Sequence, residues 1–205
     1  MNRRAAASLY RRHPQQLRAR QTVDAILEAV IRVLKREGAE AVTTNRIAEA
    51  AGVSIGSLYQ YFPDKRAIFA ALHQRHIEQI DRTIETTLIQ NASAPLGRLM
   101  PALVDAMIGA HAADPELHDL LLAQVPPHAG GTKSFAERMH SAFLLALSAR
   151  SGELKRGRNL DRQVFVVAHT VESLCHAAVR QRPPRLGLTD AKAEIARAIL
   201  VYLRS

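Results

Sequence analysis

Hydrophobic residues recur every three or four positions along most of the chain, which is the spacing of helices with one apolar face. In the stretch 18–36, for example, Val23, Ile26 and Val30 share such a face. No stretch of useful length alternates apolar and polar residues as a half-buried strand would. The pattern therefore predicts an all-α fold with nine helices, over 18–36, 44–51, 55–61, 65–90, 96–112, 115–125, 132–150, 161–180 and 190–204.

Capping residues indicate where several of these helices begin. Thr43, Ser54 and Asp64 precede the second, third and fourth helices, where their side-chain oxygens can accept hydrogen bonds from free backbone N–H groups. Asp161 is the predicted cap of the eighth helix, and Thr189 is predicted to open the ninth. The chain is then organised as a flexible basic arm over 1–17, a helix-turn-helix domain over 18–66, and a ligand-binding and dimerisation domain over 67–205.

The second and third predicted helices are short, and a turn at Gly52 separates them. Ala48 and Gly52 are small where two crossing helices must approach closely. The exposed face of the third helix carries hydroxyl groups and little bulk, on Ile55, Gly56, Ser57, Tyr59 and Tyr61. Such a surface suits the DNA major groove, where hydroxyls bond phosphates or base edges and apolar groups touch thymine methyls. The spacing alone leaves open a helical hairpin packed inside a larger all-α protein.

Charge and composition narrow the class of partner. The net charge is +9, and residues 1–20 contribute six arginines and no acid. A basic arm on a near-neutral body favours an anionic partner such as nucleic acid or a membrane surface, and a solvated tail is the alternative. The chain has no apolar run long enough to span a bilayer, no signal-like N-terminal segment and a single cysteine. We therefore expect a cytoplasmic protein with no membrane partner.

The segment Thr43–Lys65, TTNRIAEAAGVSIGSLYQYFPDK, closely resembles the DNA-binding motif of the tetracycline-repressor (TetR) family. The resemblance runs without gaps from about residue 25 to residue 72. Its most specific part is the ending Leu-Tyr-x-Tyr-Phe-x-x-Lys. The resemblance implies nine helices, three in a DNA-binding domain and six in a regulatory domain, and double-stranded palindromic operator DNA as the partner.

The resemblance also assigns contacts residue by residue. Thr44 and Lys65, each at the start of a helix, would hold phosphates, helped by the positive end of the helix dipole. Asn45 would lie close to a base edge or a phosphate. The predicted DNA-binding residues are Thr44, Asn45, Ser54, Ile55, Gly56, Ser57, Tyr59, Tyr61 and Lys65. Arginines of the basic arm would enter the flanking minor groove or attract phosphates without sequence preference.

Members of this family bind a small molecule among their middle helices, so the resemblance implies an effector pocket. The candidates form a mostly apolar wall with a few polar groups: Met100, Leu103, Met107, His111, Leu121, Gln124, Met139, Phe143, Leu147, His169, Glu172 and His176. Core packing is the alternative for each apolar member. His169, Glu172 and His176 share one helical face, where they would orient a polar ligand or form an internal hydrogen-bonded pair.

Metal, redox and enzymatic chemistry have little support in the sequence. The chain has nine histidines, but their spacing matches no metal-binding motif, and neither Cys-x-x-Cys nor His-Glu-x-x-His is present. Cys175 lies on an apolar helix and is expected to be packed there. No nucleophile–base pattern or glycine-rich phosphate loop indicates an enzyme, and an interaction scaffold is a further alternative. We expect no metal and no cofactor.

Two apolar stripes near the end of the chain predict a homodimer. They consist of Val164, Val167, Val171, Leu174 and Ala178, and of Ile195, Ile199, Leu200 and Leu203. Members of the family dimerise through their last two helices, which form a four-helix bundle; the alternative is that the stripes seal the subunit's own core. The sequence therefore predicts a dimeric repressor, released from palindromic DNA by a small and largely apolar effector. An activator or a ligand-independent regulator of the same family is the alternative.

Overall fold

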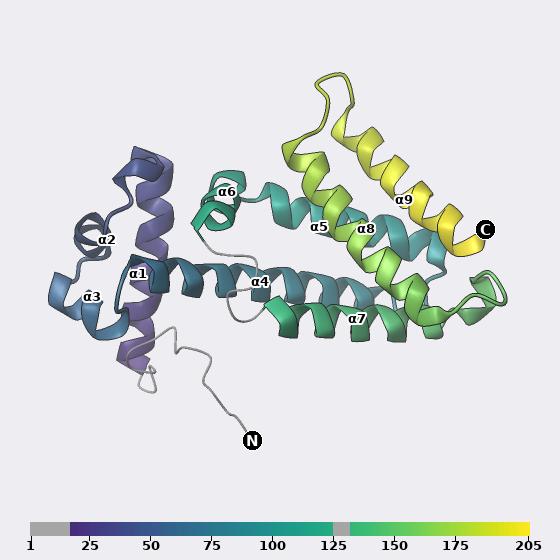
Figure 1. Cartoon of the computed structure of the whole chain (residues 1–205), viewed down its shortest axis with the longest axis horizontal. Coiled ribbons are helices and arrows are strands. Elements are labelled where there is room, and N and C mark those ends of the chain that lie inside the picture. The colour runs from purple at the N-terminus through teal and green to yellow at the C-terminus, as the bar shows by residue number, and fades with distance from the viewer. Residues whose placement is uncertain (1–16, 125–131) are drawn as a thin grey trace. The chain divides into compact units, whose positions relative to one another are not determined.

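The computed structural model describes residues 17–124 and 132–205, and the regular elements in these ranges are all helical (Figure 1). Residues 1–16 of the predicted basic arm lie outside the described residues. The all-α prediction is confirmed. The α-helices are α1 (Leu17–Glu37), α2 (Thr44–Ala51), α3 (Ile55–Tyr61), α4 (Lys65–Gln90), α5 (Leu96–Ala112), α6 (Pro115–Gln124), α7 (Thr132–Ser148), α8 (Leu160–Arg180) and α9 (Leu188–Arg204), with short 3₁₀ turns η1 (Ala39–Ala41) and η2 (Ser151–Glu153).

Three of the predicted N-terminal caps are present. The Thr43 hydroxyl accepts a hydrogen bond from the Arg46 N–H at 3.2 Å, and the Ser54 hydroxyl accepts one from the Ser57 N–H at 3.0 Å. Asp64 Oδ1 accepts a hydrogen bond from the Ala67 N–H at 2.8 Å. These bonds satisfy backbone donors that have no partner within the first turn of a helix.

The predicted starts of α8 and α9 are each wrong by one or two residues. The side chain of Asn159 caps α8 by accepting the Arg162 N–H at 3.0 Å, so Asp161 lies inside the first turn, where a carboxylate interacts favourably with the helix dipole. Helix α9 follows Gly187, whose carbonyl accepts the Ala191 N–H at 3.0 Å, and Thr189 is its second residue. In both places a residue nearer the N-terminus takes the capping position.

The chain divides into two compact units. Among the described residues, the first contains 17–76 together with 116–124, and the second contains 77–115 and 132–205. The first unit therefore extends ten residues beyond the boundary predicted at 66 and includes α6. No helix in the described residues is both long enough and apolar enough to cross a membrane.

The first unit is built on α1, which packs against α2 (Figure 1). Ile26 and Val30 of α1, Ile47 of α2 and Leu58 of α3 are completely buried in one core. The remaining buried members include Phe62, Ile68, Phe69 and, from α6, Leu117, Leu120 and Leu121. This core fixes α3 through one side of the helix and leaves its other side in solvent.

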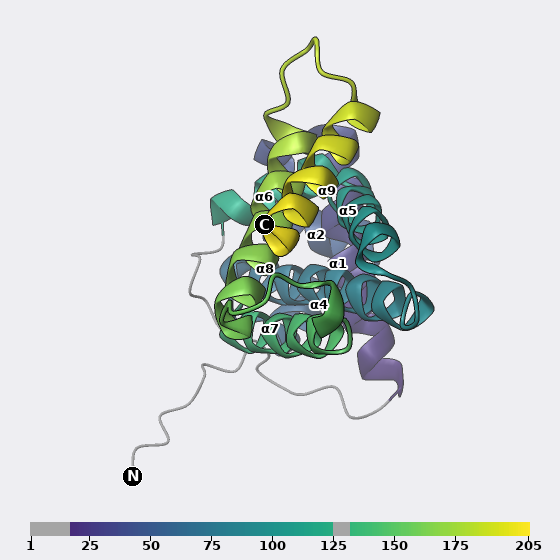
Figure 2. The same cartoon turned by 90° about the vertical axis from the view of Figure 1, so that its right-hand side faces the viewer.

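The second unit is built around α5, α8 and α9, each of which packs against the other two (Figure 2). Helix α7 packs against α8. The core of this unit contains Leu103 and Val104 of α5, Phe143 of α7, Val167 of α8 and Ile199 of α9, all at most 1% exposed. The shared core makes this unit a helical bundle of its own.

Arg150, just after α7, is a buried charged residue of the second unit. Its guanidinium donates to four backbone carbonyls: Nε to Ala94 at 2.7 Å, Nη1 to Ala146 at 2.7 Å, and Nη2 to Asn91 at 2.6 Å and Ala92 at 2.8 Å. Backbone carbonyls beyond the end of α4 are thereby satisfied by a side chain from the end of α7. Nothing in the helical periodicity predicts this cluster.

Candidate DNA-binding site

The position of α3 follows from the turn before it and from one buried anchor. Gly52 adopts φ +69°, in the left-handed region where glycine is the favoured residue, and its N–H bonds to the Glu49 carbonyl at 3.0 Å. The chain then reverses into α3, whose Leu58 is fully buried. The residues on either side of Leu58 consequently face away from the core.

Hydroxyl groups on the outer face of this motif are paired with one another. The Ser54 and Ser57 hydroxyls are 2.8 Å apart, and the Thr44 hydroxyl lies 3.3 Å from the Tyr59 hydroxyl. The second pair joins the start of α2 to the exposed face of α3. These bonds restrict the rotamers of four side chains that can both donate and accept hydrogen bonds, so the surface is partly ordered before any partner arrives.

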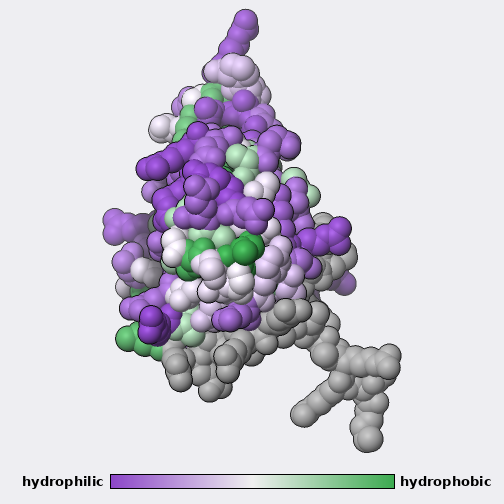
Figure 3. Space-filling view, turned by 90° about the vertical axis from the view of Figure 1, so that its left-hand side faces the viewer, coloured by the Kyte–Doolittle hydropathy of each residue, from purple (hydrophilic) through white to green (hydrophobic). Residues whose placement is uncertain are grey.

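The predicted DNA-binding residues come together on this surface. Figure 3 looks onto the side of the molecule where α2 and α3 lie, and it shows a weakly polar to apolar area surrounded by hydrophilic residues. Ile55 is 38% exposed and Tyr59 39% exposed. Asn45, Ser54 and Gly56 are also exposed, whereas Thr44, Ser57, Tyr61 and Lys65 are half-buried.

Two features of this region were not predicted from the sequence. Gln60 is exposed on α3 between the two tyrosines. Arg46, next to the predicted contact Asn45, makes ion pairs with Glu37 and Glu49. The spacing of three residues between Arg46 and Glu49 on one helix is a signal for an ion pair that was present in the sequence, whereas Glu37 comes from a different helix.

The twelve predicted effector-binding residues are divided between the two units and between core and surface. Met100, Leu103, Met107, His111, Met139, Phe143 and Leu147 are all buried in the core of the second unit. Leu121 belongs to the core of the first unit, and Gln124 is exposed. His169 and Glu172 are exposed on α8, and His169 stacks edge-on against Phe165 at 4.5 Å between ring centroids.

His111 and His176 are the two predicted polar residues that meet inside the second unit. Their rings are 5.7 Å apart between centroids in an edge-to-face arrangement, with His111 buried on α5 and His176 half-buried on α8. Among the described residues, no group of three or more histidine, cysteine or acidic side chains is placed to hold a metal ion. Cys175 is fully buried, and burial raises the pKa of its thiol to about 12.

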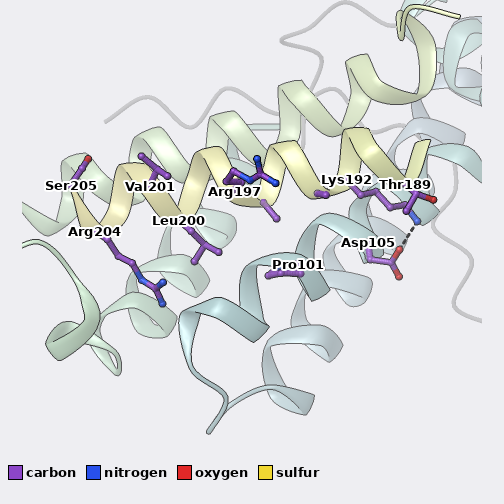
Figure 4. Close-up of a pocket in the computed structure, with 11 residues that line it drawn as sticks. Pro101, Asp105, Thr189, Lys192, Arg197, Leu200, Val201, Arg204 and Ser205 are labelled. Atoms are coloured by element: carbon purple, nitrogen blue, oxygen red, sulfur yellow. Dashed lines mark hydrogen bonds and ion pairs between the residues drawn. The ribbon is translucent and has the colours of Figure 1, made fainter. Parts of the chain in front are cut away.

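An open groove runs between α5 and α9 in the second unit (Figure 4). Its volume is about 920 Å³, within the range of small-molecule sites. Its apolar lining consists of Pro101, Ala193, Ala196, Leu200 and Val201. Lys192 is paired with Asp105, and Arg197 and Arg204 lie further along α9 towards its C-terminal end. None of these residues was among the predicted effector-binding set.

The two stripes predicted to form a dimer face belong largely to the subunit's own core. Seven of the nine residues are at most 7% exposed; the exceptions are Leu174, which is 40% exposed, and the half-buried Leu200. For those seven residues the dimer prediction is wrong, because helical periodicity identifies a buried face without showing what covers it. The exposed apolar side chains on these helices are Phe165, Val166 and Leu174 of α8 and Val201 of α9.

An exposed recognition helix held by a three-helix core places the chain among helix-turn-helix proteins. Two family models match: residues 26–72 match the model for bacterial regulatory proteins of the tetR family, and residues 95–203 match the tetracyclin repressor-like C-terminal domain. The chain belongs to the TetR family of bacterial regulatory proteins, as its sequence predicted.

Individual relatives agree with this family assignment. The nucleoid occlusion factor SlmA of Haemophilus ducreyi is 46% identical over 69 residues, which are 33% of this chain and only 31% of that protein. The transcriptional repressor KstR of Rhodococcus jostii is 27% identical over 145 residues, covering 71% of this chain and 58% of that protein. The transcriptional regulator FadR of Bacillus subtilis, crystallised with stearoyl-CoA, has a TM-score of 0.62 at 19% identity, over 89% of this chain and 97% of that one.

Proposed function

We propose that this protein is a dimeric transcriptional repressor that binds palindromic operator DNA through α3 and is released by a small effector. The observation that carries the proposal is the exposed face of α3. There the Ser57 hydroxyl is hydrogen-bonded to Ser54 and the Tyr59 hydroxyl to Thr44, beside the small residue Gly56. A short helix of low bulk enters the major groove closely, and its hydroxyls reach phosphates or base edges. Operator DNA as the partner places the protein in the cytoplasm.

The two ends of the surface have complementary roles in this proposal. Thr44 and Lys65 stand at the first residues of α2 and α4, where backbone N–H groups and the helix dipole favour a phosphate. Ile55, Gly56 and Ser57 face the bases. Tyr59 and Tyr61 bind phosphates, and the bond between Tyr59 and Thr44 fixes the spacing of the two phosphate sites.

Dimerisation places two copies of α3 on two half-sites about one DNA turn apart. We propose that the contacting face includes Phe165 and Val166 of α8 and Val201 of α9, which are between 36% and 59% exposed. Large apolar side chains gathered on two adjacent helices of one subunit are typical of an interface. A two-fold arrangement of these helices forms a four-helix bundle.

We propose the groove between α5 and α9 as the effector site (Figure 4). An apolar floor with Arg197 near the middle of α9 and Arg204 at its C-terminal end suits an organic anion with an apolar chain, which would compete with Glu194 and Glu153 for these arginines. Stearoyl-CoA, found in the solved relative FadR, is of this chemical class. The effector lowers DNA affinity only if it binds the DNA-bound and free conformations with different affinities. Helix α4 contributes residues to both units. We propose that its orientation differs between the DNA-bound and the free conformation.

The central experiment selects genomic fragments that bind the purified protein in the presence of excess non-specific competitor DNA. The proposal predicts recovery of a palindromic sequence bound at nanomolar concentration. Tyr59→Phe, which removes the hydroxyl bonded to Thr44, is expected to weaken binding, whereas Tyr202→Phe on α9 is the matched control and leaves it unchanged. Recovery of fragments without a shared sequence contradicts the proposal.

A second experiment tests repression and release. A reporter gene placed behind the recovered operator is expected to fall in expression when the protein is present; a rise identifies an activator instead. Dodecanoate or palmitoyl-CoA is then titrated onto the protein–DNA complex. Ala193→Trp fills the groove from an exposed position and should abolish release, while Ala113→Trp, exposed at the end of α5, should not. Release that is insensitive to Ala193→Trp rules out the groove.

A further inference from the structure

Two carboxylates lie close to the proposed DNA-binding surface, and one arginine forms ion pairs with both. Glu37 is the last residue of α1, and Glu49 lies on α2. The guanidinium of Arg46 donates to Glu37 through Nε at 2.8 Å and Nη2 at 2.6 Å, while its Nη1 is 2.8 Å from Glu49 Oε2. Arg46 thus makes a bidentate contact with one carboxylate and a third bond to another. This is a well-defined geometry for a side chain that is 37% exposed.

Glu37 and Arg46 each favour the charged form of the other. The hydrogen bond from Arg46, assisted by the charges of Arg46 and Arg36, lowers the pKa of Glu37 below its ordinary value. Hydrogen bonds to Glu37 and Glu49 raise the pKa of Arg46. The cluster formally carries two negative charges and one positive charge.

Contacts other than these ion pairs also hold α2 on α1. Ile47 and Ala48 of α2 are buried against the core, and Arg32 of α1 donates to the Ala50 carbonyl at 2.6 Å. The cap from Thr43 is bonded to the backbone N–H of Arg46 and not to its side chain. Isolated exposed ion pairs add little to stability, whereas a bidentate arginine within a network of charges adds more. Because α2 has these other anchors, Arg46 can serve a second role besides holding the helix.

The cluster lies within electrostatic range of the proposed phosphate contacts. Glu49 and Asn45 are four residues apart on α2, so they occupy neighbouring positions on one helical face, about 5–6 Å apart at their Cβ atoms. This separation is shorter than the screening length of about 8 Å at physiological salt. An uncompensated carboxylate at this site would repel a phosphate bound beside Asn45.

We propose that Arg46 acts on DNA through Glu37 and Glu49: its positive charge offsets one of their two negative charges, so that operator phosphates can approach α2. This inference rests on the proposed DNA binding and goes beyond it by giving a role to a residue that does not itself touch DNA. Arg46 is thus a positioning and charge-compensating residue of the interface. Freed from both acids, the same guanidinium is long enough to become a phosphate ligand.

The test measures operator affinity against salt for the wild type and three variants whose formal cluster charge differs. Arg46→Met leaves two acids alone, and operator affinity is expected to fall about threefold to tenfold at low salt. The triple variant Arg46→Met, Glu37→Gln, Glu49→Gln should recover the wild-type affinity or exceed it. The double variant Glu37→Gln, Glu49→Gln should bind most tightly, with a salt slope steeper by roughly 0.9 for each additional phosphate that the freed Arg46 neutralises.

Other roles of Arg46 give a different order of affinities. If Arg46 touches DNA directly or holds α2, the triple variant stays as weak as Arg46→Met, and the proposal is overturned. An unchanged Arg46→Met variant also overturns it. Arg75→Met is the matched control, because Arg75 lies within 3.8 Å of the carboxylates of Asp24 and Glu28 but stands ten residues beyond Lys65 on α4. If the wild type itself shows no specific binding, the proposed function fails and this inference fails with it, whereas the outcomes above overturn the inference alone. Circular dichroism verifies that each variant is folded.

Discussion

Replacing Gly56 by alanine should make the protein more stable and a weaker DNA binder at the same time. Gly56 is the second residue of α3 and has ordinary helical geometry, and an added Cβ would meet only the Ser54 hydroxyl oxygen, at 3.8 Å. Alanine is preferred over glycine in a helix by roughly 0.5–1 kcal/mol. The melting temperature should therefore rise by about 1–4 °C.

The same methyl group occupies the face that we propose enters the major groove. If it displaces the helix from the bases at a cost of about 1 kcal/mol per half-site, a dimer loses about 2 kcal/mol, or roughly thirtyfold in affinity. Fluorescence anisotropy with the selected operator measures this loss, and Gly152→Ala in η2, where an added Cβ has no neighbour within 4 Å, is the control. Undiminished affinity of a folded Gly56→Ala protein would refute the placement of Gly56 against the bases.

Three further predictions follow from the second unit. Arg150→Met removes the donor for four backbone carbonyls and should lower the free energy of unfolding by about 2–4 kcal/mol in urea titrations; a loss below about 1 kcal/mol contradicts the role of these bonds. Phe165→Glu should convert the dimer to a monomer in sedimentation experiments, whereas Leu145→Glu on α7, 75% exposed in the wild type, should not; a Phe165→Glu dimer argues against the proposed face. Cys175, with its thiol pKa raised to about 12, should resist iodoacetamide at pH 8 until denaturant is added, and rapid labelling of the native protein would contradict its burial.

The helices and the proposed DNA-binding surface could be predicted from the sequence because interactions between residues close in sequence determine them. Thr43, Ser54 and Asp64 cap helices through bonds to backbone groups only three residues away. The left-handed turn at Gly52 is likewise a local preference of one residue type. The pattern of small and hydroxyl-bearing residues on α3, flanking the apolar Leu58, then predicted which side of that helix would face solvent.

Features that depend on contacts between distant segments of the chain could not be predicted from the sequence. Val167 and Ile199 were predicted to face a partner subunit, yet each is buried by its own subunit. Met100 and Phe143 were predicted to line an effector pocket, and both are completely buried in the core of the second unit. A periodic apolar face and a pocket wall have the same composition, so only the arrangement of all the helices distinguishes a filled core from a hollow such as the α5–α9 groove.

The bonds of Arg150 also bear on how this protein tolerates sequence change. The guanidinium donates hydrogen bonds only to main-chain oxygens, at positions 91, 92, 94 and 146, and every amino acid supplies such an oxygen. Substitutions at those four positions can therefore accumulate without loss of these hydrogen bonds, provided that the backbone conformation is preserved. Position 150 itself has no such latitude, because no other side chain offers a planar fork of five N–H donors. A single side chain therefore anchors the whole segment between α4 and α5. The sequence of that segment can vary without showing that the segment is anchored.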